Sequence, residues 1–200
     1  MLRLITIGVL IPLLTACASL LMPSADRTLA ELPPGDYRLD PAHTRILFKI
    51  DHLGISSYIG RFNHADASLT FDPSAPEQAR LNATVDMHSL DVNDTDFAAD
   101  LMSCNWLCAE RFPEARFKTT GSTRVEGETL YVPGELFFRG HTHPLELVVI
   151  LRGGVNNPLT GDYTLGFDAH LTFQRSEFGM DRYIPMVGDE VRIEIYTEFF

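Results

Sequence analysis

The feature that most constrains the fold is a period-two alternation of apolar and polar side chains, which recurs from Asp36 to the end of the chain. Alternation of this kind is typical of β-strands that bury one face and expose the other. It is clearest at the end of the chain, where Val191, Ile193, Ile195 and Phe199 alternate with polar residues. The segments 45–52, 80–87 and 163–173 repeat the pattern. We therefore expect a domain built mainly of antiparallel strands.

Five further strands are predicted at 57–62, 65–71, 115–125, 129–138 and 145–152. Turns are expected at Asp72-Pro73, Glu126-Gly127 and Gly153-Gly154, and Pro133-Gly134 is expected to interrupt its strand as a bulge or kink. Only 93–108 has helical spacing, with Phe97, Leu101 and Cys104 on one face and Asp94 as a candidate N-cap. The fold class predicted is all-β with one short helix. We favour a closed barrel of about eight strands over a sandwich, because closure leaves no free edge.

The N-terminus has the pattern of an export signal. Arg3 precedes the apolar run 4–14, which is too short to span a bilayer, since spanning takes ~20 residues. Leu14-Thr15-Ala16-Cys17 resembles the lipobox of bacterial lipoproteins, which implies cleavage before Cys17 and lipidation of its sulfur. Ala18 and Ser19 then favour, by the same resemblance, the outer membrane of a Gram-negative cell, with the domain in the periplasm. The alternative is an ordinary signal peptide with an incidental cysteine.

These features divide the chain into a signal peptide at 1–16, a lipidated cysteine with a flexible linker at 17–35, and one domain at 36–200. The formal charge is −11 at pH 7, and one of the few basic residues lies in the signal peptide. Nucleic acid is therefore not expected as a partner, because binding to phosphates needs a basic face.

Two cysteines remain in the domain, Cys104 and Cys108. An exported protein meets an oxidising compartment, and on a helical turn the two Cα atoms would lie about 6 Å apart, so we expect a disulfide. Two buried thiols, or a metal or redox pair, are the alternatives, although a redox pair is more often spaced Cys-x-x-Cys.

Several motifs, taken in order, resemble the YceI-like, polyisoprenoid-binding family. The first is Tyr37-Arg38-Leu39-Asp40-Pro41-Ala42-His43, and His52-Leu53-Gly54-Ile55-Ser56 leads into Gly60-Arg61-Phe62 and Phe71-Asp72-Pro73. Later motifs are Phe112-Pro113, Ala115-Arg116-Phe117, Gly134-Glu135-Leu136, Phe178-Gly179-Met180 and Gly188-Asp189-Glu190-Val191. Together they cover residues 36–200.

The resemblance implies a lipocalin-like, extended antiparallel barrel whose apolar bore holds a long lipid tail. The sequence departs from the family pattern at Ala98, Ala99 and Asp100, at the two cysteines, and at His141 and His143. No cofactor other than a bound isoprenoid lipid is expected. The sequence alone leaves open a barrel packed solid by its own side chains, and the resemblance favours a hollow one. The residues predicted to bind the lipid are Ile46, Phe48, Ile50, His52, Leu69, Val85, Leu165, Phe167, Phe173, Ile193 and Ile195.

Four other candidate groups have alternative interpretations. His52 ends an apolar face and either donates to a ligand head group or is a core histidine bonded to a backbone carbonyl. His43 is expected to order a turn. His141 and His143 would share a face in a strand, but zinc needs three or four ligands and no third is identifiable. Arg61, Arg139 and Arg175 are candidates for an anionic head or for surface ion pairs.

No catalytic motif is present: there is no nucleophile elbow, phosphate-binding loop or plausible Cys-His pair. The function predicted is non-catalytic binding, sequestration or transport of a polyprenyl phosphate or isoprenoid quinone. One alternative is a metal protein or enzyme centred on His141 and His143. Another is an interaction module, for instance a partner of a membrane electron-transfer protein, that uses exterior residues such as Tyr196.

Overall fold

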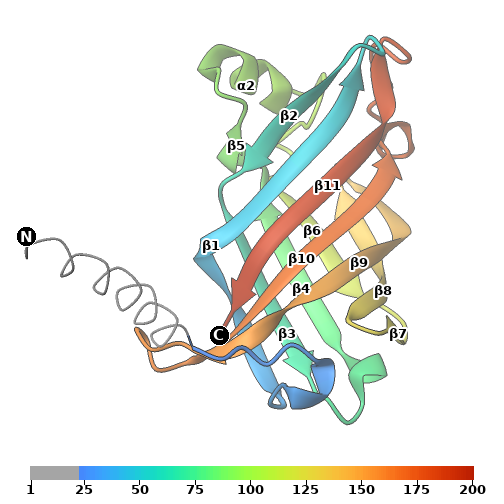
Figure 1. Ribbon diagram of the computed structural model, residues 1–200. Helices are drawn as coiled ribbons and strands as arrows, with labels where there is room; N and C mark the ends of the chain where they lie inside the picture. The colour runs from blue at the N-terminus through green and yellow to red at the C-terminus, as the bar shows by residue number, and fades with distance from the viewer. Residues whose placement is uncertain (1–22) are drawn as a thin grey trace, which may run out of the picture.

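The alternating segments form the strands of a closed antiparallel barrel (Figure 1). The computed structural model describes residues 23–200. The barrel order is β1, β11, β10, β9, β8, β6, β4 and β3, and β3 pairs again with β1. The predicted all-β barrel with one short α-helix is confirmed. The strands are β1 Gly35–His52, β2 Ser56–Phe62, β3 Ala65–Phe71, β4 Arg80–Asp86, β5 Leu90–Asp91, β6 Glu114–Thr119, β7 Arg124–Glu126, β8 Thr129–Phe138, β9 His141–Asn156, β10 Tyr163–Gln174 and β11 Val187–Phe199.

The long strand β1 closes the barrel. One edge pairs with β11 from Leu39 to His52, with register shifts between Asp40 and Arg45 and between Ile50 and His52. The other edge pairs with β3 at Gly35–Arg38 and with β2 at Ile46–His52. A single strand therefore reaches two neighbours in turn, and β2 extends the wall of the barrel beyond β3.

The two ends of the barrel carry different structures (Figure 1). The helix α2, Thr95–Met102, lies at one end beside β2 and β5. The opposite end carries the short 3-10 helix η1, Leu29–Glu31, together with the turn between β9 and β10. Three more 3-10 helices occur at Pro76–Gln78, Met87–Ser89 and Arg175–Phe178. Among the described residues, no helix is long and apolar enough to cross a bilayer.

The described part of the predicted flexible linker packs on the barrel, so that prediction is wrong for residues 26–32. Leu29 is 7% exposed and Leu32 is 2% exposed. Asp26 exchanges two backbone hydrogen bonds of 2.7 Å with Gly154, and the Tyr163 hydroxyl donates to its carboxylate at 2.5 Å. The two leucines are apolar enough to be buried, so this segment covers one end of the barrel. Cys17 and the predicted signal peptide lie outside the described residues.

The predicted turn at Gly153-Gly154 is instead part of β9, and the chain turns at 157–162. A Cβ atom on Gly154 would lie 2.5 Å from the Tyr163 hydroxyl and 2.8 Å from a methyl carbon of Leu32. Glycine in this strand therefore permits a close approach of the N-terminal segment.

The predicted strand at 115–125 is two strands, β6 and β7, separated at Gly121. Pro133-Gly134 lies inside β8 and does not interrupt its pairing with β9. On its other edge, β8 changes partner there, from β7 to β6. A proline, which has no N–H to donate, is tolerated at such a break in the ladder.

The helix is shorter than the predicted 93–108. Asp94 caps it as expected, since its carboxylate accepts from the backbone N–H groups of Asp96 and Phe97. After Met102 the chain folds back, and Leu107 N–H donates to the Leu101 carbonyl at 3.0 Å. Cys108, with φ 52°, has a left-handed backbone that an α-helix does not accommodate. The two cysteines therefore lie in the loop after α2 and not on a helical turn.

Substitution of Leu32 by alanine tests whether the N-terminal segment is part of the fold. We expect Leu32→Ala to lower the free energy of unfolding by about 2–5 kcal/mol, as is usual for a buried leucine. Leu159→Ala is the control, because Leu159 is 93% exposed and its loss should be nearly neutral. Chemical denaturation measures both. Equal stability of the two variants would show that residues 26–32 do not contribute to the core.

Candidate functional site

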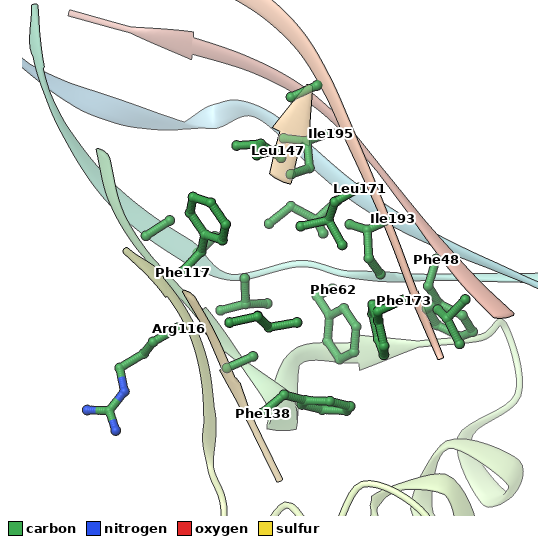
Figure 2. A pocket seen from close by; sticks show the side chains of 18 of the residues that line it. Phe48, Phe62, Arg116, Phe117, Phe138, Leu147, Leu171, Phe173, Ile193 and Ile195 are labelled. Carbon is green, nitrogen blue, oxygen red and sulfur yellow. The ribbon is translucent and has the colours of Figure 1, made fainter. Parts of the chain in front are cut away.

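The barrel encloses a cavity of about 760 Å³ lined by the inward faces of its strands. Figure 2 shows the rings of Phe62, Phe117, Phe138 and Phe173 pointing into this space. About 25 water molecules would be needed to fill it, at ~30 Å³ each, and aliphatic and aromatic walls give them few partners. A volume of this size lies in the usual range for small-molecule sites, roughly 300–1,000 Å³. The interior therefore suits an apolar guest.

Most of the residues predicted to bind lipid line this cavity. The ones that do so are Ile46, Phe48, Ile50, His52, Leu69, Val85, Phe167, Phe173, Ile193 and Ile195. Leu165 is the exception and corrects the prediction. It is fully buried and pairs with Gly154, beside the segment that covers this end of the barrel. Its side chain is therefore part of the packed end and not of the cavity wall.

The sequence reasoning missed two groups of lining residues. Phe117, Leu136 and Leu147 belong to strands that were predicted, and their alternation could have placed them on the inner face. Phe97 lies on the apolar face of α2, and its spacing does not show that this face meets the cavity. Trp106 and Tyr183 come from loops, where no periodic signal marks the inner face. Figure 2 also shows the Arg116 side chain pointing away from the other lining residues.

The cavity is closed at one end and open at the other. At the η1 end its lining residues Leu29, Phe71, Leu130 and Phe199 are all buried. At the α2 end the lining side chains reach the surface, and this end we call the mouth. It is lined by His52, Tyr58, Phe97, Asp100, Leu101, Trp106, Tyr183 and Val187. His52 is exposed there, so it is not a core histidine.

Arg175 orders one side of the mouth. It is 1% exposed and lines the cavity, and no carboxylate among residues 23–200 forms an ion pair with it. Its guanidinium instead donates to the carbonyls of Met180 at 2.6 Å and Gly188 at 2.7 Å, and to those of Arg182 and Val187 at 2.9 Å each. Burial lowers the pKa of Arg175, and Asp189 and Asp181 oppose this shift. The bonds tie 180–188 to the barrel.

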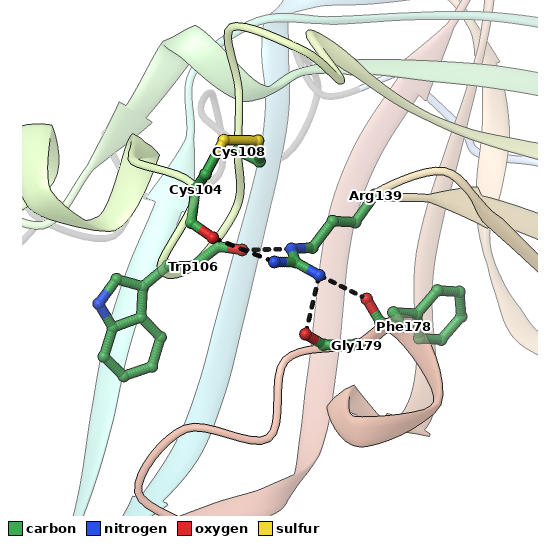
Figure 3. Close-up of a disulfide and its surroundings, with 6 residues drawn as sticks. All are labelled: Cys104, Trp106, Cys108, Arg139, Phe178 and Gly179. Atoms are coloured by element: carbon green, nitrogen blue, oxygen red, sulfur yellow. Dashed lines mark hydrogen bonds between the residues drawn. A yellow bond between two sulfur atoms is a disulfide. The ribbon is translucent and has the colours of Figure 1, made fainter.

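Arg139 holds the loop after α2 in the same manner, by bonding its backbone carbonyls (Figure 3). Its guanidinium donates to the Trp106 carbonyl at 2.6 Å and to the Cys104 carbonyl at 3.1 Å. It also donates to the carbonyls of Phe178 at 3.2 Å and Gly179 at 2.8 Å. Cys104 and Cys108 are joined as a disulfide within this loop. Arg139 therefore links the disulfide loop to the segment after β10, and it is not free to receive a ligand head.

Arg61, the third arginine considered from the sequence, lies outside the cavity. Its guanidinium contacts the Asp91 carboxylate at 2.6 Å, and both side chains are partly exposed. This is the surface ion pair that was the alternative to a ligand contact. Asp91 has a lowered pKa because the Asn93 backbone N–H and then the Arg61 side chain bond its carboxylate.

His141 and His143 lie at the start of β9, with ring centroids 6.5 Å apart. One ring nitrogen of His143 lies 3.0 Å from the Glu177 carbonyl oxygen, and its ring packs edge-on against Phe178 at 4.8 Å. In residues 23–200 no third ligating side chain joins the pair, whereas Zn²⁺ in proteins takes three or four. The His143 ring therefore packs against the segment Arg175–Phe178, whereas His141 is exposed.

The three ligating side chains that do converge are Asp40, His43 and Glu198. His43 lies 2.8 Å from the Asp40 carboxylate and 3.8 Å from that of Glu198. The hydrogen bond to Asp40 raises the pKa of His43, and Glu198 adds to this effect. Asp40 also accepts from the Ala42 backbone N–H at 2.8 Å. The turn expected at His43 is instead an irregularity within β1, where the register with β11 shifts between Asp40 and Arg45, and this group orders it.

Replacement of Arg175 tests whether it organises the mouth. We expect Arg175→Met to lower the free energy of unfolding by about 3 kcal/mol, because several buried carbonyls lose their donor. Arg152→Met is the control, since Arg152 is 66% exposed and its ion pair with Asp168 at 3.6 Å should be worth little. Thermal denaturation compares the two, and hydrogen exchange should rise at 180–188 only in the first. Similar values for both variants would contradict this role.

Comparisons with known sequences and with solved structures agree on one family and one fold for this chain. The YceI-like domain model matches residues 37–199. A UPF0312 protein of Pseudomonas paraeruginosa is 31% identical over 183 residues, which are 90% of this chain and 95% of that protein. A UPF0312 protein of Serratia proteamaculans is 34% identical over 187 residues, covering 92% and 93%.

Two solved structures share the barrel. BcnA of Burkholderia cenocepacia superposes with a TM-score of 0.71 at 23% identity, covering 80% of this chain and 98% of BcnA. A polyisoprenoid-binding domain from Saccharophagus degradans gives a TM-score of 0.63 at 10% identity, covering 82% and 97%. The family model spans nearly the whole barrel and the relatives match across nearly their full length, so the chain belongs to the YceI-like domain family.

Proposed function

We propose that this protein binds an isoprenoid-type lipid, either a polyprenyl phosphate or an isoprenoid quinone, and sequesters or carries it without altering it chemically. The observation that carries the proposal is the cavity of about 760 Å³, apolar along its length and open at one end. The polyisoprenoid-binding name of the Saccharophagus degradans structure supports the same ligand class.

The energetics of burial suit a long hydrocarbon. Each buried CH₂ group contributes ~0.8 kcal/mol, so ten such groups contribute about 8 kcal/mol. Association costs on the order of 4–15 kcal/mol, and a preformed cavity keeps the cost of ordering the protein small. A few prenyl units are therefore enough for binding, and a longer tail strengthens it.

The arrangement of polar groups gives the ligand a direction. The lining near η1 is almost entirely apolar and buried, whereas His52, Tyr58, Asp100 and Trp106 bring polar atoms to the mouth. A tail that entered first would lie along the apolar bore, and the polar head would remain near His52. Either a phosphate or a quinone oxygen can accept a hydrogen bond from an imidazole N–H.

The composition of the wall supports binding and not covalent catalysis. Among the described residues that line the cavity there is no serine, cysteine or lysine. The titratable side chains at the mouth are not arranged as a nucleophile with an adjacent base, the arrangement that nucleophilic catalysis uses. We therefore propose a non-enzymatic role.

The location of the protein is also part of the proposal. Cys17 would carry the lipid anchor in the periplasm, attached to the outer membrane. The chain enters the barrel at its closed end, where Asp26 pairs with Gly154, so an anchor at Cys17 would leave the mouth free. If the ligand is a quinone, the partner we propose is a membrane electron-transfer protein, because such proteins exchange electrons with quinones.

A cavity-filling substitution tests the proposed site. Ala169 faces the cavity from β10, and Ala169→Phe should place a ring in the space that a tail would use. We expect at least a tenfold loss of co-purifying lipid, measured by native mass spectrometry and organic extraction of protein from its own host. Thr172→Phe is the control, because Thr172 lies on the exposed face of the same strand.

Two outcomes would contradict the proposal. Wild-type protein that is repeatedly empty and takes up no prenyl lipid would exclude this ligand class. Equal lipid content in the two variants would show that the lipid is held somewhere other than the bore.

A further inference from the structure

Large apolar side chains are exposed around the mouth. Leu53 is 53% exposed, Ile55 83%, Phe97 39%, Tyr183 47% and Met186 55%. We call these five residues the apolar rim. They come from the turn between β1 and β2, from α2, and from the segment before β11. Other exposed apolar side chains occur elsewhere, namely Ile59, Ile150 and Tyr196 on β2, β9 and β11, Leu159 in the turn between β9 and β10, and Phe200 at the C-terminus. The β9–β10 turn and the C-terminus lie away from α2 (Figure 1).

The rim residues are joined to one another and to the cavity. The Leu53 backbone N–H donates to the Met186 carbonyl at 2.8 Å. The β1–β2 turn and the segment before β11 therefore lie side by side, as Figure 1 shows. Tyr183 packs against Trp106 with ring centroids 6.0 Å apart, and Phe97 and Tyr183 also line the cavity. The apolar surface therefore continues from the interior of the barrel onto its outer edge.

Two rim residues are held in a conformation that disfavours bulky side chains. Leu53 has φ 59° and Tyr183 has φ 61°. The left-handed region costs an L-residue other than glycine, asparagine or aspartate roughly 1–2 kcal/mol. Such strain tends to persist at functional sites. Here it holds Leu53 and Tyr183 with about half of each side chain exposed to solvent.

We propose that the apolar rim docks on a lipid bilayer, so that a tail can pass between membrane and bore without crossing water. This inference rests on the proposed function, because the ligand class proposed for the bore resides in membranes. The rim is continuous with the bore, and a rim buried in the interface of a bilayer would place the mouth directly on the hydrocarbon. Shallow insertion of a few apolar side chains is how peripheral proteins gain such contact.

The charges beside the rim specify the kind of membrane. Asp51 precedes the β1–β2 turn, Asp94 caps α2, and α2 itself carries Asp96 and Asp100 with no basic residue. Arg182 is the basic residue within the segment before β11, next to Asp181, and its side chain donates to the Tyr183 hydroxyl at 2.9 Å. An acidic surround is repelled by anionic lipid. The rim therefore fits a zwitterionic surface such as phosphatidylcholine or phosphatidylethanolamine.

Vesicle flotation of residues 23–200, which contain every element of the barrel, tests the proposal with phosphatidylcholine vesicles. The variants are Ile55→Asp and Met186→Asp, singly and together, because these side chains lie on the rim and do not line the cavity. Leu159→Asp is the matched control at the opposite end of the molecule. Prenyl lipid uptake from detergent is measured on every variant, which separates docking from binding in the bore.

We expect wild type and Leu159→Asp to float equally and the double rim variant at least tenfold less, with uptake from detergent unchanged. Vesicles enriched in phosphatidylglycerol should bind wild type more weakly. The proposal is overturned if wild type does not float, if the rim variants float like wild type, or if Leu159→Asp loses as much. Reversible dimerisation through the rim without flotation would assign it to a second copy of the chain. If the wild type takes up no prenyl lipid from detergent, the result contradicts the proposed function and not the docking of the rim.

Discussion

The structure depends on the closure of one long strand against two neighbours. Because β1 pairs with β11 on one edge and with β3 and β2 on the other, eight strands form a complete ring and no edge is left open in it. Closure fixes the width of the bore, and the inward side chains, large as many of them are, leave about 760 Å³ unfilled. A packed interior normally has few voids larger than a water molecule. The cavity is thus a property of the ring and not of a loosely packed core.

The two ends of the ring are stabilised by different means, and this gives the barrel a direction. One end is filled by Leu29 and Leu32, so it gains apolar burial. At the other end Arg139 and Arg175 bind backbone carbonyls of the surrounding loops. Backbone carbonyls accept all the hydrogen bonds that each guanidinium makes there, so no apolar side chain has to cover the opening. These hydrogen bonds therefore order the loops and leave the mouth open.

Much of the fold could be predicted, because alternation depends only on which face of a strand is buried. It located most of the strands and most of the inner face of the barrel. It placed Leu165 in the bore, however, since alternation gives the face of a residue and not its height along the axis. The pair Gly153-Gly154 predicts a turn from its composition alone. In the structure it serves close packing instead, and that use depends on Leu32 and Tyr163, which the local sequence does not reveal. The predicted helix is too long because the spacing of apolar residues continues past Met102. Neither the left-handed backbone of Cys108 nor the reversal of the chain before it changes that spacing.

The candidate site was predictable where strands build it and not where loops do. Trp106 and Tyr183 reach the mouth on irregular loops that hydrogen bonds from Arg139 and Arg175 hold in place. The bond from Arg139 to Trp106 joins residues 33 positions apart, and no periodic pattern marks such a contact. His141 and His143 were left as an alternative, because their spacing allows a shared face and no third ligand could be identified. The rings do lie near each other, and packing against Phe178 accounts for the position of His143.

The central claim is that the bore accepts an apolar chain, and the protein contains its own reporter for this event. Trp106 is the single tryptophan of the chain and lines the cavity at its mouth. Titration of ligand-free protein with a prenyl alcohol, followed by Trp106 fluorescence, tests the claim most directly. The account predicts a saturable change with one ligand bound per chain, at higher affinity as the tail lengthens. A fluorescence signal that is unchanged by every chain length, with no ligand retained after gel filtration, would contradict it.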